Sequence, residues 1–487
     1  MAAPAIVGAA PSEQGFWANA PRFAIVMMAV FGVRLHEVLP LVGYLRPALL
    51  LSTVGMAFLL WRSSPEAIKS AVNDRTFVLI LAYFGWAALT SPWAIWRAHS
   101  IASLMLVVPV AALTLSELLC APTRRNVDRL ALGFAISASL LAADLLLFGK
   151  DIMGRMSGTG MLDSNDIAAL FSMAFPFAAA AALRAGPALR RVVAALAAIV
   201  LVLAILASAS RGGALALVAG VLTLTFGLRG GRRWFALALF VLSGYLAVEF
   251  GPATFRERIA TLTTINEDYN FQDFGGRQQI WKRGRMYYRQ HPIAGVGIGN
   301  FETAEGNYMR SIGVHGKWSA PHNAYIQAFS ELGTVGGLIF LALLASLASS
   351  SLTLWGRQRA DTSGRRGVPV GPAPPQIHAP EYLAALVAYC LGAYFLSLAY
   401  FYALFGLAGL VSVAVRAARA EQGLPLDAAT SAERAPRARV VTRVAAPTPA
   451  DAAVPVAPAP AAGVVRPGIG WRSARSAFRR RGPSGGR

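Results

Sequence analysis

Long apolar stretches recur along most of this sequence, and their length limits what the chain can fold into. Many approach the roughly 20 residues that an α-helix needs to cross the hydrocarbon of a bilayer. Several have no polar face, as in residues 78–88, 101–113, 130–148, 192–207 and 215–228. A core helix of a soluble protein normally keeps one polar face. The sequence therefore predicts an all-α polytopic membrane protein.

The composition supports this prediction and excludes other classes. Of the 487 residues, 55% are hydrophobic and 14% charged, and the mean hydropathy is +0.51, which excludes a soluble protein of this size. The net charge of +21 comes from cations that lie between the apolar stretches. Membrane orientation and anionic headgroups explain such cations better than nucleic acid does. Cys120 and Cys390 lie in apolar segments, so neither a disulfide nor a thiolate metal site is indicated.

We expect about twelve spans, counted from the apolar stretches and from the basic residues in the links between them. The spans are residues 23–33, 47–61, 77–96, 101–120, 130–148, 167–183, 192–209, 214–228, 234–250, 334–355, 382–398 and 402–415. Lys and Arg concentrate in every second link. This bias predicts that both termini are cytoplasmic and that the long polar interval before span ten is periplasmic.

The chain then divides into five regions. They are an N-terminal cytoplasmic segment (1–20), spans one to nine (21–250), one large periplasmic loop (251–322), spans ten to twelve (323–416) and a tail (417–487). The tail is rich in Ala, Pro and Arg, so we expect it to be basic, disordered and cytoplasmic. The first segment has no continuous apolar core, so no cleavable signal peptide is expected. A multi-pass protein of a bacterial inner membrane is predicted.

Arg211 is the first candidate for chemistry. It lies at the tight turn Ser210-Arg211-Gly212-Gly213 between spans seven and eight, on the predicted outer face. A guanidinium beside the free N–H groups of a helix N-terminus is well suited to bind phosphate. An interfacial Arg whose side chain reaches the lipid headgroups is an equal alternative from this turn alone.

A second cation cluster lies in the long polar interval, on a helix expected over residues 277–290. Arg277 and Trp281 are four residues apart and share a face of that helix. The cations between Lys282 and Arg285 would equally suit a basic helix resting on headgroups. The glycine-rich run that follows, residues 291–301, lacks the strand–turn–helix context of a nucleotide loop, so a compact turn is expected.

His322 is the candidate general base. It is followed by Asn323, Tyr325 and an apolar helix, with Glu331 further along. A neutral imidazole near the bilayer surface is well suited to take a proton from a hydroxyl at neutral pH. Asn323 is expected to cap the helix that it opens. A lone interfacial His is more often structural, and that alternative remains open here.

The run Asp163-Ser164-Asn165-Asp166 opens span six. Two carboxylates three residues apart would suit a divalent cation. The alternative is a helix N-cap, in which an Asp or Asn side chain accepts from free N–H groups. No other acidic residue lies nearby in the sequence, so the N-cap is favoured and no metal site is expected.

Four stretches, taken in order, resemble the bacterial O-antigen ligase family, which includes lipopolysaccharide O-antigen ligases, polysaccharide polymerases and protein O-oligosaccharyltransferases. The stretches are residues 163–168, 208–213, 277–301 and 322–333. The resemblance covers roughly residues 20–415 and leaves the tail outside it. It implies a GT-C-like membrane fold and a metal-independent, inverting glycosyltransferase that needs no cofactor and binds no nucleic acid.

The resemblance also implies roles for single residues. Arg211 and Arg277 would bind the pyrophosphate of an undecaprenyl-pyrophosphate-linked glycan donor, and His322 would accept the proton of the acceptor hydroxyl. The supporting residues implied by the matching stretches are Asn165, Asp166, Trp281, Asn323, Tyr325 and Glu331. The acceptor stays open: lipid A–core sugar, another lipid-linked glycan, or a protein Ser or Thr. Membrane lipid is a further expected partner.

Two other functions compete with the transferase. A transporter or flippase of lipid-linked glycan would need polar residues along the interiors of its spans, whereas here they gather at one face. A non-catalytic scaffold for envelope polysaccharide assembly would need no general base, so substitution of His322 distinguishes it.

Overall fold

The computed structural model describes residues 20–33, 47–152, 155–157, 163–184, 186–228, 230–260, 276–316, 318–362 and 380–424. Most of the predicted N-terminal segment and tail lies outside the described residues, as does part of the predicted loop, 261–275. Two units are distinguished, 1–434 and 435–487, and all described residues belong to the first.

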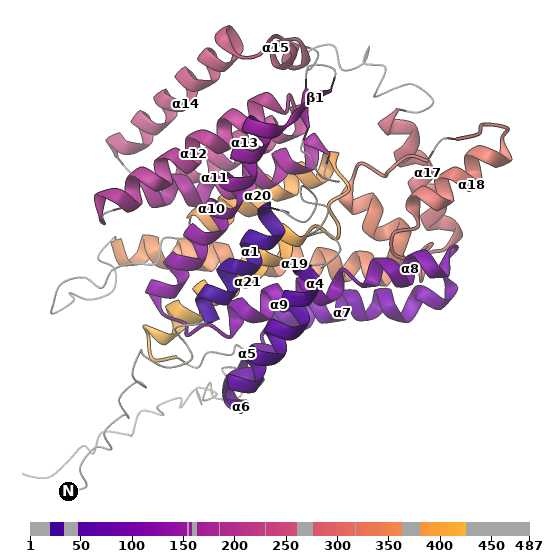
Figure 1. The fold of residues 1–487 in the computed structure, drawn as a ribbon, viewed down its shortest axis with the longest axis horizontal. Helices are drawn as coiled ribbons and strands as arrows, with labels where there is room; N and C mark the ends of the chain where they lie inside the picture. The colour runs from indigo at the N-terminus through magenta and orange to yellow at the C-terminus, as the bar shows by residue number, and fades with distance from the viewer. Residues whose placement is uncertain are drawn as a thin grey trace, which may run out of the picture. The chain divides into compact units, whose positions relative to one another are not determined.

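Helices form nearly all of the described chain (Figure 1). In order they are α1 (Ala20–Val33), α4 (Pro47–Leu50), the π-helical η2 (Leu51–Gly55), α5 (Met56–Arg62), α6 (Pro65–Val72), α7 (Arg75–Thr90), the 3-10 turn η3 (Ser91–Trp93), α8 (Arg97–Leu104), α9 (Val107–Leu118), α10 (Arg124–Phe148), α11 (Ser164–Leu183), α12 (Ala188–Ala207), α13 (Arg211–Gly227), α14 (Gly231–Phe250), α15 (Ala253–Ala260), α17 (Arg277–Gln290), α18 (Phe301–Ser311), α19 (Ala324–Thr362), α20 (Pro380–Phe395) and α21 (Tyr402–Ala420). One short antiparallel hairpin, β1 (Lys150–Ile152) and β2 (Arg155–Ser157), follows α10.

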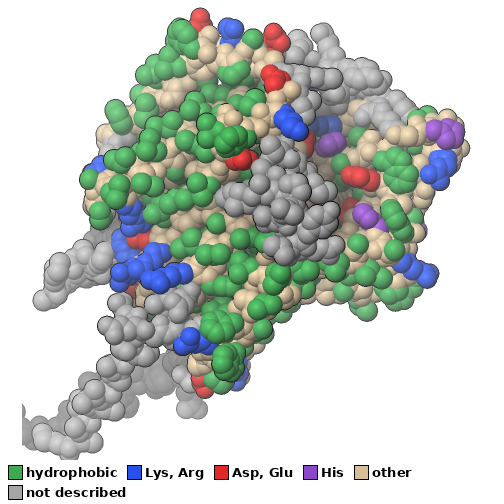
Figure 2. All heavy atoms as spheres, in the orientation of Figure 1, with side chains coloured by type: hydrophobic (Ala, Val, Ile, Leu, Met, Phe, Trp, Pro, Cys, Tyr) green, Lys and Arg blue, Asp and Glu red, His purple; other side chains and the backbone are tan. Residues whose placement is uncertain are grey.

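Apolar helices of membrane-spanning length dominate this fold. Within the described residues, eight helical stretches are long and apolar enough to cross a bilayer: Arg75–Trp93, Arg97–Leu118, Arg124–Phe148, Ser164–Leu183, Ala188–Ala207, Arg233–Phe250, Ala324–Arg357 and Tyr402–Ala420. Apolar side chains also cover most of the face in Figure 2, with Lys and Arg gathered toward its left-hand side. The chain is thus an all-α, multi-pass membrane protein. The count of twelve spans, the GT-C likeness and the periplasmic loop stay predictions.

Small residues let the helices around α11 pack closely. Gly213 of α13 lies so near Ala168 of α11 that a Cβ at residue 213 would overlap it. Further along the same helices, a Cβ at Gly392 of α20 would lie 3.4 Å from the Ala169 side chain. Between apolar helices in lipid, such close approach supplies the van der Waals contact that holds them together. As a result, the start of α13 and the end of α20 meet at the start of α11.

The opposite end of α11 carries a partly buried ion network. Arg184, just after α11, pairs with Asp128 of α10 at 2.8 Å and with Glu381 of α20. Arg190 also approaches Asp128, at 3.8 Å. The 20 residues of α11 separate this network from the start of the helix by about 30 Å, the rise of 20 helical residues. The two polar ends of the bundle are therefore about one bilayer core apart.

Helix α19 consists of two legs. Gly333 has φ 67° and ψ −165°, so the helix breaks there after its first nine residues. Beside the break, the Thr334 N–H donates to the Pro292 carbonyl at 2.7 Å, and the Trp86 indole donates to the Leu332 carbonyl at 2.9 Å. The predicted span 334–355 matches the second leg. The first leg, which sequence reasoning left out of the span, carries the residues that follow His322.

The first leg of α19 packs on α17. A Cβ at Gly284 of α17 would overlap the Ile326 side chain, so the glycine sets how closely the two helices approach. The expected helix over residues 277–290 is confirmed. Its cations do not form one headgroup-facing surface, because Arg283 is buried and makes a bidentate ion pair with Glu305 at 2.6–3.0 Å.

The contact between Glu117 of α9 and Gly409 of α21 allows the packing of these two helices to be tested. Glu117 is fully buried, and its oxygens have no hydrogen-bond partner among the described residues. A Cβ at Gly409 would overlap this carboxylate. We expect Gly409→Ala to destabilise the protein by roughly 1–3 kcal/mol, the usual cost of overpacking. Thermal unfolding in detergent measures this loss.

Two further variants complete this test. Gly85→Ala is the matched control, because a Cβ at Gly85 would meet nothing within 4 Å. Adding Glu117→Ala to Gly409→Ala should recover much of the lost stability, because the colliding group is gone. Equal melting temperatures for Gly409→Ala and the control would contradict this account of the packing.

Candidate active site

Asn165 joins the segments that meet at the start of α11. Its side-chain oxygen accepts from the Ser210 hydroxyl at 2.9 Å and from the Arg155 guanidinium at 3.0 Å. Arg155 also donates to the Ser208 carbonyl at 3.2 Å. The Ser210 hydroxyl in turn accepts from the Gly213 N–H at 3.2 Å and caps α13. One amide therefore fixes the hairpin strand β2 and the turn before Arg211.

The turn that presents Arg211 is strained. Ala209 has φ 47°, in the left-handed region that non-glycine residues rarely adopt. His322 also has φ 47°, and these two are the non-glycine residues with positive φ in the described chain. Backbone strain of this kind gathers at functional sites, where the surrounding structure holds it in place. Arg211 itself is half-buried at the first position of α13.

Asp163 stands at the N-cap position of α11, but its side chain makes no capping hydrogen bond, so the favoured alternative is right about the position and wrong about the contact. Its carboxylate accepts from the Ser164 hydroxyl at 3.0 Å and from the Asn165 amide at 2.8 Å. Burial alone would raise the pKa of this carboxyl, but these hydrogen bonds and nearby Arg155 lower it below its ordinary value. Asp163 is therefore ionised at neutral pH. Within the described residues, no three His, Cys, Asp or Glu side chains gather in a group that could hold a metal ion.

His322 is fixed through the backbone on both sides. Its own N–H donates to the Ser397 hydroxyl at 2.9 Å. The Trp281 indole donates to the carbonyl of the preceding residue, Pro321, at 3.1 Å. The following residue, Asn323, caps α19 by accepting from the Ile326 N–H at 2.9 Å, which confirms the predicted cap. The backbone turn that carries the imidazole is therefore rigid.

The environment keeps this imidazole neutral. Burial and, to a smaller extent, nearby Arg277 lower the pKa of His322 to about 4, although Asp163 partly opposes them. A His with this pKa is unprotonated at pH 7 and can accept a proton. Its low pKa also makes it a weak base in the resting state, so its proton affinity must rise as a substrate's negative charge enters the site.

The same charge effects bring the cations into one site. A charged group shifts a neighbour's pKa mainly over short distances. The charges of Arg277 and Asp163 both shift the pKa of His322. The pKa of Arg155 is lowered mainly by burial, and the charges of Asp163 and Arg211 shift it as well. Asp163 is thus shared between the two sets. The structure gathers three guanidiniums, one carboxylate and one imidazole at the start of α11.

The end of α20 lies between these groups. The ring of Phe395 lies against Gly212, so that a Cβ there would be 3.5 Å from the Phe395 Cβ. The Tyr394 ring meets Trp281 edge to face, with centroids 5.4 Å apart, and its carbonyl accepts from the Asn323 amide at 3.0 Å. With Ser397 bound to the backbone of His322, this short segment contacts Gly212 beside Arg211, the Trp281 ring and the residues around His322.

Two predicted supporting residues have roles away from this cluster. The Tyr325 hydroxyl donates to the Cys390 carbonyl at 3.0 Å and ties α19 to α20. The buried Glu331 carboxylate accepts from the N–H groups of Gly299 at 2.7 Å and Phe301 at 3.2 Å. It therefore fixes the glycine-rich turn, which is compact as predicted. Asp166 follows Asn165 in the first turn of α11 and is half-buried.

Arg155 is the residue that sequence reasoning missed. The sequence patterns gave this residue no role in the site. Its place depends on the hairpin turning back toward α11, which no local pattern in residues 150–157 announces. Ser397 was missed for a similar reason, because its hydroxyl binds a residue 75 positions earlier in the chain.

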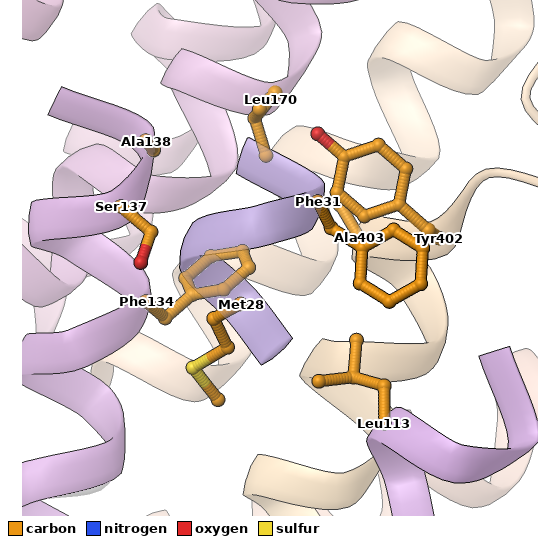
Figure 3. A pocket seen from close by; sticks show the side chains of 9 residues that line it. All are labelled: Met28, Phe31, Leu113, Phe134, Ser137, Ala138, Leu170, Tyr402 and Ala403. Atoms are coloured by element: carbon orange, nitrogen blue, oxygen red, sulfur yellow. The ribbon is translucent and has the colours of Figure 1, made fainter. Parts of the chain in front are cut away.

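The cavity in Figure 3 is separate from the site. It lies among α1, α9, α10, α11 and α21 and is lined by Met28, Phe31, Leu113, Phe134, Ser137, Ala138, Leu170, Tyr402 and Ala403. None of the charged residues described above lines it. Its walls are almost entirely apolar, and we interpret it as a packing gap inside the bundle.

The chain was compared with known protein families and with curated proteins. Residues 195–341 match the family model described as O-antigen ligase. The match supports the resemblance of the sequence to the O-antigen ligase family. The matched segment includes Arg211, Arg277 and His322, whereas Arg155 and Asn165 lie before it. No curated protein matches the chain.

Proposed function

We propose that this protein is a membrane glycosyltransferase that moves a glycan from undecaprenyl pyrophosphate to an acceptor hydroxyl at the periplasmic face of a bacterial inner membrane. The observation that carries the proposal is the neutral imidazole of His322 beside Arg277, in the cluster that also holds Arg155 and Arg211. A base next to several fixed cations suits a reaction that deprotonates one substrate and releases an anion from the other.

The proposed chemistry is a single displacement. His322 takes the proton of the acceptor hydroxyl, whose oxygen forms a bond to the anomeric carbon of the donor. The bond from that carbon to the pyrophosphate oxygen breaks, and undecaprenyl pyrophosphate leaves. Attack from the face opposite the leaving group inverts the anomeric configuration, and no metal ion is required.

Fixed guanidiniums stabilise the leaving group in this proposal. Negative charge builds on the pyrophosphate as it departs, and Arg211 and Arg277 offset it in a partly desolvated site. Arg155 is a third cation for the same charge. Asp163 lies near Arg155 and His322, where it balances the cations and steadies the imidazolium that forms. The apolar helices next to the site would hold the polyprenyl chain.

The test is transfer by the purified protein. A donor made of a glycan on undecaprenyl pyrophosphate is offered with each of three acceptors: lipid A–core, a second lipid-linked glycan, and a protein rich in Ser and Thr. Product with one acceptor supports the proposal and assigns ligase, polymerase or protein oligosaccharyltransferase. Failure to form product with all three, while the donor crosses a proteoliposome membrane, would favour a flippase instead.

Arg155 supplies a prediction of its own. Arg155→Ala removes a cation and the hydrogen bonds to Asn165 and Ser208, so we expect roughly tenfold weaker donor binding, the scale of one charge-assisted hydrogen bond. Arg155→Lys keeps the charge but cannot bridge both partners, and we expect an intermediate effect. Lys150→Ala, an exposed cation of the same hairpin, is the matched control. Donor titration against the purified variants measures all three.

A further inference from the structure

A second group of aromatic and polar side chains lies around the start of α8, apart from the site described above. The Trp96 ring stacks on the His99 imidazole, with centroids 5.0 Å apart and planes at 20°. Glu302, in the first turn of α18, lies beside His99, whose charge acts on its carboxyl. Trp96 is 51% exposed, so one face of this stack is open to a ligand.

Hydrogen bonds connect the segment around Trp96 to the glycine-rich turn, residues 291–301. The Trp96 N–H donates to the Asn300 side chain at 3.1 Å, and the Ile95 N–H donates to the Val296 carbonyl at 3.0 Å. The fully buried Asn300 also donates to the Ser100 hydroxyl at 2.7 Å. Such a network fixes the backbone that carries the exposed ring, and the stacking on His99 adds a contact to the ring itself, as a preorganised binding surface requires.

The same turn is tied to the helix that follows His322. Gly299 donates to Glu331 at 2.7 Å, and Glu331 is nine residues beyond His322 on the first leg of α19. The eight helical residues from Ala324 to Glu331 span about 12 Å. The Trp96 stack is therefore held at a fixed offset from the imidazole, at the other end of a rigid helix.

We propose that Trp96, His99 and Glu302 form a subsite for a sugar ring of the glycan chain, an inference that rests on the proposed function. An aromatic face takes the apolar C–H face of a pyranose, while an adjacent carboxylate and imidazole bind its hydroxyls. The ring belongs to the donor glycan or to the acceptor glycan, at a distance from the bond that forms. The subsite would hold the chain in line with His322.

The charge of this surface favours a sugar over a phospholipid headgroup. Exposed tryptophans alone are common at membrane interfaces. Here, however, the exposed carboxylate of Glu302 accompanies the exposed Arg97 that follows Trp96, so the surface carries both signs of charge and attracts anionic headgroups less than a cationic surface would. Neutral sugar hydroxyls can donate to the carboxylate and accept from the guanidinium.

Binding is tested without relying on transfer. The probe is the free oligosaccharide released from the lipid-linked donor by mild acid, observed by saturation-transfer NMR with the full-length protein in detergent. Trp96→Ala and Glu302→Gln should each weaken binding, by roughly tenfold for the loss of the aromatic face. Trp61→Ala, an 82% exposed tryptophan on α5, should change nothing. Unchanged binding in Trp96→Ala, or equal loss in the control, overturns the subsite.

Kinetics then separate the two sources of the ring. Trp96→Ala should raise KM about tenfold for a long glycan and leave KM for a single-sugar substrate unchanged. If the bound ring belongs to the donor, the rise in KM appears when the donor glycan is lengthened. If the ring belongs to the acceptor, the rise appears when the acceptor glycan is lengthened. Equal loss with short and long substrates of both kinds overturns the proposal. If the wild type forms no product while oligosaccharide binding still depends on Trp96, the transferase proposal fails and the subsite stands.

Discussion

His322→Ala is expected to lower the rate of glycan transfer by about 10²–10⁴-fold, the usual contribution of a general base. The protein should still insert and fold, because the Trp281 and Ser397 hydrogen bonds reach the backbone of this segment and not the imidazole. Initial rates with a defined lipid-linked donor measure the loss. Transfer at the wild-type rate would remove His322 from the mechanism and restore the scaffold or transporter as alternatives.

The matched control for this variant is His315→Ala, an exposed histidine of the same interval. Its rate should equal that of the wild type. Similar melting temperatures for the wild type and both variants would establish that the loss at residue 322 is chemical. If His315→Ala loses as much activity, the histidines of this region act together through its fold and not through one proton transfer.

The pH dependence follows from the lowered pKa of His322. A base works in its unprotonated form, and a pKa of about 4 leaves His322 unprotonated above about pH 5. The value of kcat/KM, which reports the free enzyme, should therefore fall with acid near pH 4, well below the ordinary histidine range. Arg277→Gln removes a cation that lowers this pKa, so the same fall should move to higher pH.

Loss of the two predicted pyrophosphate cations is expected to have the second largest effect. Arg211→Ala and Arg277→Ala should each lower the transfer rate by roughly 10²–10³-fold, the scale of one lost charge-stabilising group. Donor binding should weaken as well, because the pyrophosphate is charged before the reaction starts. Measuring donor affinity and single-turnover rate separately distinguishes the two effects.

Arg285→Ala is the matched control for these cations, because Arg285 is exposed on the same helix as Arg277. It should bind donor like the wild type. A Lys at residue 211 or 277 keeps the charge but loses the planar, two-pronged geometry, so we expect partial recovery. Unchanged donor affinity in both Ala variants would contradict the pyrophosphate clamp.

The sequence predicted the helices well for identifiable physical reasons, whereas the roles of the site residues stay predictions. Apolar runs of bilayer length indicate helices without help from the rest of the chain, and the helix over residues 277–290 follows from local composition. His322 and Asn323 open a helix, and the cap of Asn323 is a local property of the backbone. The resemblance to a known family supplied roles that these patterns alone left open.

What the sequence did not predict depends on contacts between distant segments. Arg155 enters the site because a hairpin brings it to Asn165, ten residues away, and to Ser208. Arg283 looks like its basic neighbours in the sequence, yet it is buried on Glu305. The kink at Gly333 is likewise set by contacts with Pro292 and Trp86. No local pattern encodes such pairings.

The close contact of Gly284 with Ile326 has a consequence for how Arg277 and His322 are spaced. Because α17 and the first leg of α19 meet through a residue without a side chain, helix packing sets the gap between the Arg277 end of one helix and the His322 end of the other. A bulkier residue at position 284 would wedge the two helices apart and widen that gap.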